Sequence, residues 1–252
     1  MLSAAASIAL AMGGVLAIQS VANAAATGGA TGVPYLCDSK LYQVSGGSYY
    51  KFDPTTNAYA SFGSDSVASL NGIGYNTKDN AVYGMSGSNL YRVYGDGKMY
   101  NLGAVTYAAG SSAVSTGGDF YPGAGDNKLV NASATKWTLT DVYAKTATNF
   151  TLNAATGNTP SGQTWKPFDI AIKGNKGYGF DGDDVGLYIA DLSSTGVTKI
   201  TKKTITWGVG TTAQNGQYGA AYIDRSDDLY FFSNTGTKLY KITAASAAST
   251  TD

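Results

Sequence analysis

Histidine and glutamate are both absent from this chain of 252 residues, so all 17 of its acidic side chains are aspartates. Without histidine, neither a Ser-His-Asp nor a Cys-His nucleophile can be built, and the commonest ligand of transition metals is missing. Without glutamate, any acid–base pair must use Asp, whose ordinary pKa of about 3.9 must shift further to serve near neutral pH. These absences disfavour hydrolase chemistry, although Asp, Lys and Tyr remain available.

Excess charge is also lacking. The 17 basic residues balance the 17 acidic ones, and only 13% of the residues are charged. The chain therefore has neither the basic face that nucleic acid requires nor a polybasic membrane-surface segment. Cys37 is the single cysteine, so no disulfide can form within the chain. We expect a buried thiol there, with an intermolecular bridge as the alternative.

The first 26 residues have the pattern of an export signal. Residues 2–26 carry no charge, residues 7–21 are apolar, and Ala22-Asn23-Ala24 is a small-x-small cleavage site. The basic residues that usually begin such a signal are missing. The alternative is a membrane anchor, for which the apolar run is short. We predict a signal peptide over 1–26 and a short linker over 27–34, and hence a secreted or cell-surface protein whose mature part has no membrane span.

What the chain has in abundance is a repeated pattern of short strands and tight turns. A strand of small residues is followed by a polar turn, a strand ending in an aromatic residue, a second turn and a Leu-Tyr strand. The matching positions Gly72, Gly118, Ile170 and Ala220 are spaced by 46, 52 and 50 residues. Periods of about 40–50 residues with four strands each are typical of propeller blades. The sequence thus predicts an all-β fold, a β-propeller of about five four-stranded blades over residues 35–243.

The ends of the repeat region leave the ring unsettled. The first repeat is expected to lack its inner strand and the last repeat its outer strand. Each would then hold three strands of a four-stranded blade, so the two overlap and do not combine into one blade. The ring is then either a closed one of five blades or part of a larger one, with the Ala/Ser/Thr tail at 244–252 as a linker. An open β-solenoid or a sandwich is the second architecture. Small residues at the start of the inner strands predict crowding around the axis.

Long connections between blades are the expected location of a binding site. Residues 104–116, 155–167 and 204–217 should gather on one face of the propeller, where exposed tryptophans beside amide groups would suit a sugar or a peptide. The competing interpretation is that both tryptophans fill the space between blades. The candidate ligand-binding residues are Trp165, Lys166, Trp207, Gln217 and Asn71.

An acidic cluster on the same face suggests a metal site. Asp181, Asp183 and Asp184 lie between the second and third strands of one blade, and Asp169 begins its inner strand. Together the four carboxylates could hold Ca²⁺ through oxygen ligands alone. The alternative is an ordinary hairpin turn, since Asp and Gly are common turn residues.

The repeats resemble those of a known group of proteins. The resemblance is carried by Leu70-Asn71-Gly72-Ile73-Gly74-Tyr75-Asn76, then Val82-Tyr83-Gly84 and Leu90-Tyr91-Arg92-Val93, and by the opening Lys40-Leu41-Tyr42-Gln43-Val44. They look like repeats of exported bacterial proteins of unknown function that are associated with surface and adhesin-like modules. The resemblance implies a propeller and an extracellular location, and it identifies no functional residue.

The leading functional hypothesis is a non-catalytic extracellular module, monomeric, that binds a glycan, a cell-wall component or a protein surface. The first alternative is an enzyme, a Ca²⁺-assisted lactonase-like or glycosidase-like hydrolase that uses Asp residues. The second is a structural surface repeat. Fold alone does not choose among them.

Overall fold

The computed structural model describes residues 32–36, 40–45, 47–53, 55–56, 58–64, 70–152, 163–208, 215–234, 238–244 and 247. The predicted signal peptide at 1–26 and Cys37 lie outside these residues, as do most of the predicted linker and tail. In the part of the chain that is described, no helix is long and apolar enough to cross a membrane.

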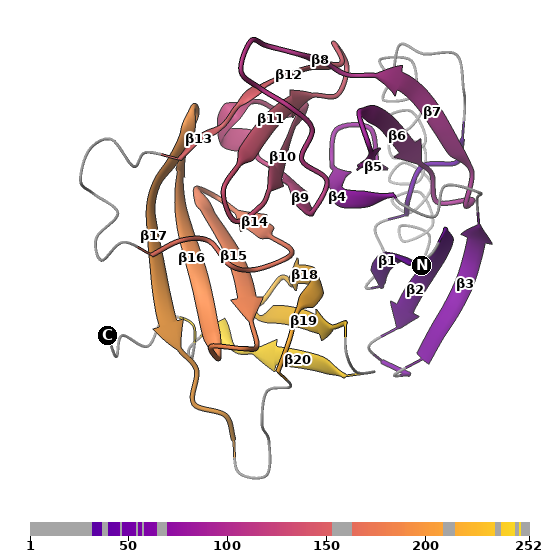
Figure 1. The fold of residues 1–252 in the computed structure, drawn as a ribbon. Coiled ribbons are helices and arrows are strands. Elements are labelled where there is room, and N and C mark those ends of the chain that lie inside the picture. Colours follow the sequence, from indigo (N-terminus) through magenta and orange to yellow (C-terminus); the bar gives the residue numbers. More distant parts are fainter. Residues whose placement is uncertain are drawn as a thin grey trace, which may run out of the picture.

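Five separate antiparallel sheets surround a common axis (Figure 1). Blade 1 contains β1 (Leu41–Ser45), β2 (Ser48–Asp53) and β3 (Ala58–Ser64); blade 2 contains β4 (Asn71–Asn76), β5 (Ala81–Ser86), β6 (Asn89–Val93) and β7 (Met99–Ala104). Blade 3 contains β9 (Gly117–Phe120), β10 (Lys128–Ala132), β11 (Trp137–Asp141) and β12 (Thr146–Asn149). Blade 4 contains β14 (Ala171–Lys173), β15 (Lys176–Asp181), β16 (Gly186–Ser193) and β17 (Gly196–Thr204); blade 5 contains β18 (Tyr218–Ile223), β19 (Leu229–Ser233) and β20 (Leu239–Ile242). The protein is a five-bladed β-propeller, which confirms the predicted fold class and excludes a single continuous sheet.

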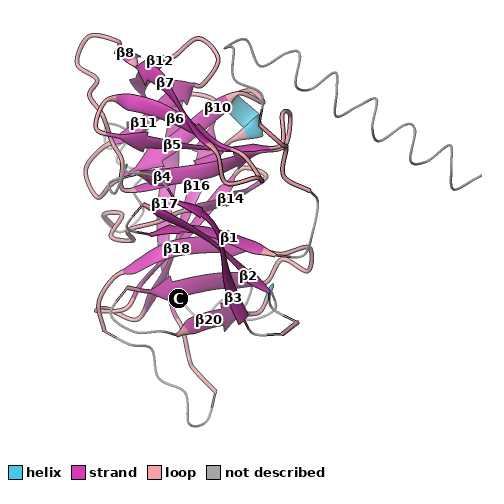
Figure 2. Cartoon of the chain, turned by 90° about the vertical axis from the view of Figure 1, so that its right-hand side faces the viewer, coloured by secondary structure: helices cyan, strands magenta, loops and turns pink. Residues whose placement is uncertain are grey.

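Two connections between blades contribute strands of their own. β8 (Thr106–Tyr107) pairs in parallel with β12, and β13 (Thr151–Leu152) pairs in parallel with β17. Each short strand therefore lies on the outer edge of the next blade before the chain returns to the axis. Figure 2 shows the blades from the side, with loops at both ends of the strands.

Aspartate and asparagine side chains shape the hairpin turns. Asn76 accepts a hydrogen bond from the Lys78 N–H, and Asp224 accepts one from the Ser226 N–H. Asp141 accepts the N–H groups of Tyr143 and Ala144, two and three residues later. A side-chain oxygen that accepts a backbone N–H two residues later is the usual Asx-turn arrangement. The recurring acidic turns of the sequence thus serve turn formation.

The inner strands approach one another closely, as the small residues predicted. A Cβ placed on Gly118 would lie 2.2 Å from the Gly72 carbonyl oxygen, and one on Gly117 would lie 2.7 Å from the Asp169 Cα. These neighbours are backbone atoms, so no side chain could rotate away to make room. The crowding at the axis therefore requires glycine at these positions.

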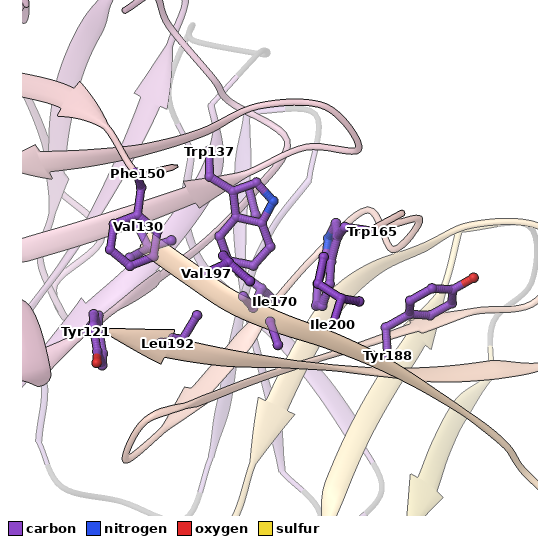
Figure 3. Close-up of a cluster of buried hydrophobic side chains, with 12 residues drawn as sticks. Tyr121, Val130, Trp137, Phe150, Trp165, Ile170, Tyr188, Leu192, Val197 and Ile200 are labelled. Carbon is purple, nitrogen blue, oxygen red and sulfur yellow. The ribbon is translucent and has the colours of Figure 1, made fainter. Parts of the chain in front are cut away.

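Apolar clusters fill four of the five interfaces between blades. Figure 3 shows the cluster between blades 3 and 4, where Trp137 and Trp165 meet edge to face with ring centroids 5.1 Å apart. Comparable clusters lie between blades 1 and 2, blades 2 and 3, and blades 4 and 5. The sheets bury apolar side chains against their neighbours at these interfaces. This is the packing expected of a repeat whose single sheets are too small to bury both of their faces alone.

The seam between blade 5 and blade 1 differs from the other interfaces. Among the described residues, no buried apolar cluster spans it, and the aromatic contact across it joins Tyr59 of β3 to Phe232 of β19 at 6.1 Å between ring centroids. Blades 1 and 5 have three strands each. β1 lines the axis together with β4, β9, β14 and β18, so the expectation that the first repeat lacks its inner strand is wrong; among the described residues, the strand not found in blade 1 is the fourth, outer one.

Candidate functional site

A cavity of about 620 Å³ lies on the axis, where residues of all five innermost strands meet. Its wall combines aromatic rings with hydrogen-bonding groups. The rings come from Tyr42 of β1, Tyr75 of β4 and Tyr222 of β18, and the polar groups include Asn71 of β4 and Asp119 of β9. Tyr222 is 36% exposed, so its ring remains accessible. Pockets of about 300–1,000 Å³ are the usual size for small ligands.

Asp169 lies in the wall of this cavity, directly before β14, and its carboxylate joins three blades. Oδ1 accepts the N–H of Gly118 in blade 3 at 3.1 Å and that of Ile170 at 2.9 Å. Oδ2 accepts the N–H of Ala221 in blade 5 at 2.9 Å. Adjacent blades do not pair edge to edge at the axis, so the N–H groups on the axial side of the inner strands have no strand partner there. The Asp169 carboxylate provides acceptors for these N–H groups.

Asp119 makes the corresponding link between blades 3 and 4. Its Oδ2 accepts the Ile172 N–H at 2.6 Å, and its Oδ1 accepts its neighbour's N–H, that of Phe120, at 2.8 Å. On the other side of blade 3, the Asn131 amide donates to the Gly72 carbonyl at 2.9 Å. Asp119, Asn131 and Asp169 therefore link neighbouring inner strands through hydrogen bonds to backbone groups.

The two aspartates titrate far above their ordinary range. Burial raises the pKa of Asp119 to about 7, although two backbone N–H groups act in the opposite direction. Burial raises the pKa of Asp169 to about 8, and the nearby Asp119 adds to the increase. Both carboxyl groups therefore hold a proton through most of the acidic and neutral range, a property frequent at functional sites.

The structure separates the candidate ligand-binding residues. Asn71 lines the axial cavity, and its Oδ1 accepts the Gly72 N–H at 2.9 Å. Gln217 is exposed at the end of the connection from blade 4 to blade 5, where it pairs with Asp181 as an isolated bridge. Lys166 is exposed and forms an ion pair with Asp184 at 2.8 Å.

Both tryptophans fill space between neighbouring blades, which was the competing interpretation of the sequence. Trp165 is 1% exposed and packs among the residues between blades 3 and 4, so the expectation of an exposed ligand-stacking ring is wrong. Trp207 is partly buried against Phe180 and Tyr240, with ring centroids 5.6 Å and 5.3 Å away. A ring that fills the wedge between sheets buries more apolar area than one that lies on a loop.

The predicted Ca²⁺ site is not assembled either. Among the described residues, no three acidic side chains are grouped closely enough to hold a metal ion. Asp181 accepts the N–H groups of Asp183 and Asp184, and Asp183 accepts the Gly216 N–H at 2.7 Å. Asp184 pairs with Lys166 and also with Lys202 at 3.2 Å, which helps to lower its pKa to about 2. The cluster is thus a hairpin turn that supports the following loop.

Among the cavity residues that the sequence did not point to are Tyr42, Asp119, Tyr75 and Tyr222. The last two occupy alternate positions of inner strands, a pattern that reads as ordinary core. Asp119 carried a usable signal, because an aspartate inside a strand of small residues is uncommon and needs hydrogen-bond partners.

Comparison with known proteins places the chain in a family. The model of a family described as a repeat of unknown function, DUF6923, matches residues 37–252. The chain belongs to this family. The membership confirms the resemblance to a propeller-like repeat family, and no curated protein matches the sequence.

Solved structures are similar to the chain at low sequence identity. An auxiliary nutrient binding protein from Bacteroides ovatus is 13% identical with a TM-score of 0.50, and the alignment covers 82% of this chain and 52% of that one. A protein of the same description from Bacteroides thetaiotaomicron is 15% identical with a TM-score of 0.48, and the same shares are covered. The chain spans about half the length of both. A Bacteroides caccae protein of unknown function is 15% identical with a TM-score of 0.48, and 90% of it is covered.

Proposed function

We propose that this chain is an exported binding module that holds a small, hydroxyl-rich ligand, a sugar, in its axial cavity without transforming it. The observation that carries the proposal is the wall of the cavity, which combines tyrosine rings, among them the accessible ring of Tyr222, with carboxyl and amide groups. Sugars present an apolar ring face and a rim of hydroxyl groups, so they need this combination.

The charge and composition of the chain agree with a neutral ligand. Net charge is zero, which gives no long-range attraction for a highly charged partner. In the cavity, the protonated carboxyls of Asp119 and Asp169 can each donate a hydrogen bond to a hydroxyl oxygen while they accept backbone N–H groups. The likeness to nutrient binding proteins concerns the fold alone, and the proposal rests on the cavity.

Calorimetric titration with a panel of mono- and disaccharides tests the proposal. Tyr222→Ala removes the most exposed ring of the wall and should weaken binding by about tenfold, the equivalent of a lost aromatic contact of about 1.4 kcal/mol. Tyr107→Ala is the matched control, because Tyr107 lies in β8 on the outer edge of blade 3 and outside the cavity wall. Equal affinities of the two variants would refute the assignment.

Export is tested separately. Expression of the full chain in a secreting bacterium should release a protein whose N-terminus begins close to residue 26, as mass spectrometry would show. Retention of the intact first 26 residues in the cell would contradict an exported module and leave the cavity assignment untouched.

The hydrolase alternative has one observation in its favour. The raised pKa of Asp169, about 8, would suit a general acid. Against it, both oxygens of that carboxyl already accept backbone N–H groups of neighbouring blades, which fits a structural role. Release of reducing sugar or opening of a lactone by the wild-type chain, lost in Asp169→Asn at a temperature where that variant is folded, would favour the enzyme.

A further inference from the structure

One end of the axial cavity is formed by the turns that follow the inner strands. Thr77 follows β4, Gly174 follows β14 and Arg225 lies in the turn after β18, and all three line the cavity. Tyr222, the accessible ring of the wall, lies next to the last residue of β18. An aromatic ring and a guanidinium group therefore lie at the same end of the cavity.

Arg225 is the cation of this wall whose charge no carboxylate balances. Its side chain is exposed, and among the described residues it forms neither an ion pair nor a hydrogen bond. The other two cations of the wall are paired, Lys40 with Asp53 at 2.7 Å and Lys173 with Asp227. The charge of Arg225 is thus available to a ligand.

The acidic groups around this end of the cavity are engaged elsewhere. Asp224 accepts the Tyr230 hydroxyl at 3.0 Å and two backbone N–H groups of its own turn. Asp126, the exposed acid of the wall, pairs with Lys78 at 3.7 Å. Because neither carboxylate pairs with Arg225, the N–H donors of its guanidinium group remain for a ligand or for water.

The guanidinium group lies close to the Tyr222 ring. Burial raises the pKa of the Tyr222 hydroxyl and the charge of Asp224 adds to the increase, whereas the positive charge of Arg225 acts in the opposite direction. A charge has this effect only when it is near the titrating group. A sugar that packs on the Tyr222 ring therefore has substituents within reach of the guanidinium group.

The buried carboxyl groups of the wall do not repel an anion in mildly acidic solution. The pKa of Asp119 is about 7 and that of Asp169 about 8, so at pH 6 both groups are mostly protonated. An ordinary carboxyl group of a ligand is ionised at that pH. The zero net charge of the chain gives no attraction over a distance, but it leaves the charge of Arg225 to act at contact.

We infer that the axial cavity selects an acidic sugar, a uronic acid, over the neutral sugar of the same configuration, with the carboxylate on Arg225 and the sugar ring on Tyr222. The inference rests on the proposed function and adds to it the charge of one substituent. A guanidinium group binds a carboxylate through two parallel N–H···O hydrogen bonds, a geometry that a hydroxyl group does not match. Neutral sugars bind in the same place but more weakly, because they lack this pair of bonds.

Calorimetric titration of the full chain with matched pairs of methyl glycosides at pH 6 tests the inference. The pairs are glucoside and glucuronide, galactoside and galacturonide, and mannoside and mannuronide, whose members differ only in the carboxylate. In the pair that binds best, the acid should bind about tenfold more tightly than the neutral sugar. Raising the salt from about 50 to 300 mM should weaken binding of the acid about twofold and leave that of the neutral sugar unchanged.

The preference within a pair, measured for each variant, separates recognition from folding. Arg225→Gln should reduce it from about tenfold to less than about twofold, and Arg225→Lys should keep part of it, because lysine retains the charge without the planar fork. Lys238→Gln is the matched control. Lys238 is exposed and belongs to the same blade, but it directly precedes β20 and lies outside the cavity wall.

Loss of the preference in Arg225→Gln, with full retention in Lys238→Gln, supports the inference. A neutral sugar that binds as tightly as its acid, a preference that survives Arg225→Gln, or an equal loss in the Arg225 and Lys238 variants would overturn it, while the cavity assignment would stand. Absence of binding by every sugar, neutral or acidic, would overturn the cavity assignment and this inference together.

Discussion

The stability of this propeller should fall as the pH rises from 5 to 8. Asp119 and Asp169 ordinarily titrate at 3.8, but at the axis their pKa values are about 7 and about 8. Between pH 5 and the folded-state values, the folded chain keeps two protons that the unfolded chain has lost. The stabilisation is therefore complete below the unfolded pKa and is lost as the pH rises through about 7 and 8.

The magnitude follows from the number of protons. Each such proton lowers the free energy of unfolding by about 1.4 kcal/mol per pH unit, so two lower it by at most about 3 kcal/mol between pH 5 and 6. For a domain of this size, about 1 kcal/mol corresponds to 2–4 °C in melting temperature, which gives a fall of up to about 10 °C over that unit.

The composition simplifies this experiment. With no histidine and no glutamate, no side chain with an ordinary pKa between 5 and 8 competes. The aspartates whose pKa is lowered, among them Asp53, Asp141 and Asp184, titrate below 3.8 and thus outside the window. Burial also raises the pKa of Asp79 and of Asp181, so these two groups act in the same direction as Asp119 and Asp169.

Thermal melts from pH 5 to 8 at constant ionic strength provide the assay. Asp119→Asn and Asp169→Asn should each reduce the slope by about half, while Asp126→Asn, whose side chain is 67% exposed, should leave it unchanged. A melting temperature that is flat or rises over this range would show that both carboxylates are ionised in the folded state, and the reasoning would be wrong.

Other predictions concern packing, and chemical denaturation checks each of them. Gly118→Ala should destabilise by more than about 3 kcal/mol, because its Cβ would lie 2.2 Å from the Gly72 carbonyl oxygen. Gly87→Ala should cost only about 1 kcal/mol, since Gly87 has a φ of +58° and open space around it. Trp165→Ala should cost about 3–5 kcal/mol by leaving a cavity between blades 3 and 4. Tyr59→Ala should cost less than about 1 kcal/mol, because among the described residues a single edge-to-face ring contact spans the seam; a larger cost would mean that further contacts close the ring.

The blades could be predicted from the sequence because their signals are local. Strand alternation, Asp-rich turns and the spacing of Gly72, Gly118, Ile170 and Ala220 all follow from the geometry of a single blade. The inner position of β1 was not predicted because Leu41-Tyr42 has the Leu-Tyr pattern of strands farther from the axis, for example Leu90-Tyr91. Distance from the axis, which distinguishes the two kinds of strand, is a property of the assembled ring.

The candidate site was harder to predict because its residues come together only across blades. A tryptophan in a long connection reads as exposed, yet Trp165 is drawn between two sheets by the apolar area available there. The Asp181 turn was conspicuous in the sequence, but its carboxylates are used by nearby N–H groups and lysines. Asp119 is unusual as an aspartate inside a strand of small residues, but its backbone partner in β14 is 53 residues away in the sequence and is brought beside it only by the assembled ring.

The hydrogen bonds that join neighbouring blades and the proposed ligand binding involve the same groups at the axis, and this decides which variants are informative. Asp169 holds blades 3, 4 and 5 together, so its removal changes both the shape of the cavity and its chemistry. Tyr222 projects from β18 with its ring accessible, and the ring makes a tilted contact with Tyr230 of the same blade, with centroids 5.7 Å apart. Loss of ligand binding in Tyr222→Ala at an unchanged melting temperature would therefore report on recognition alone, whereas the same loss in Asp169→Asn could follow from a loosened ring.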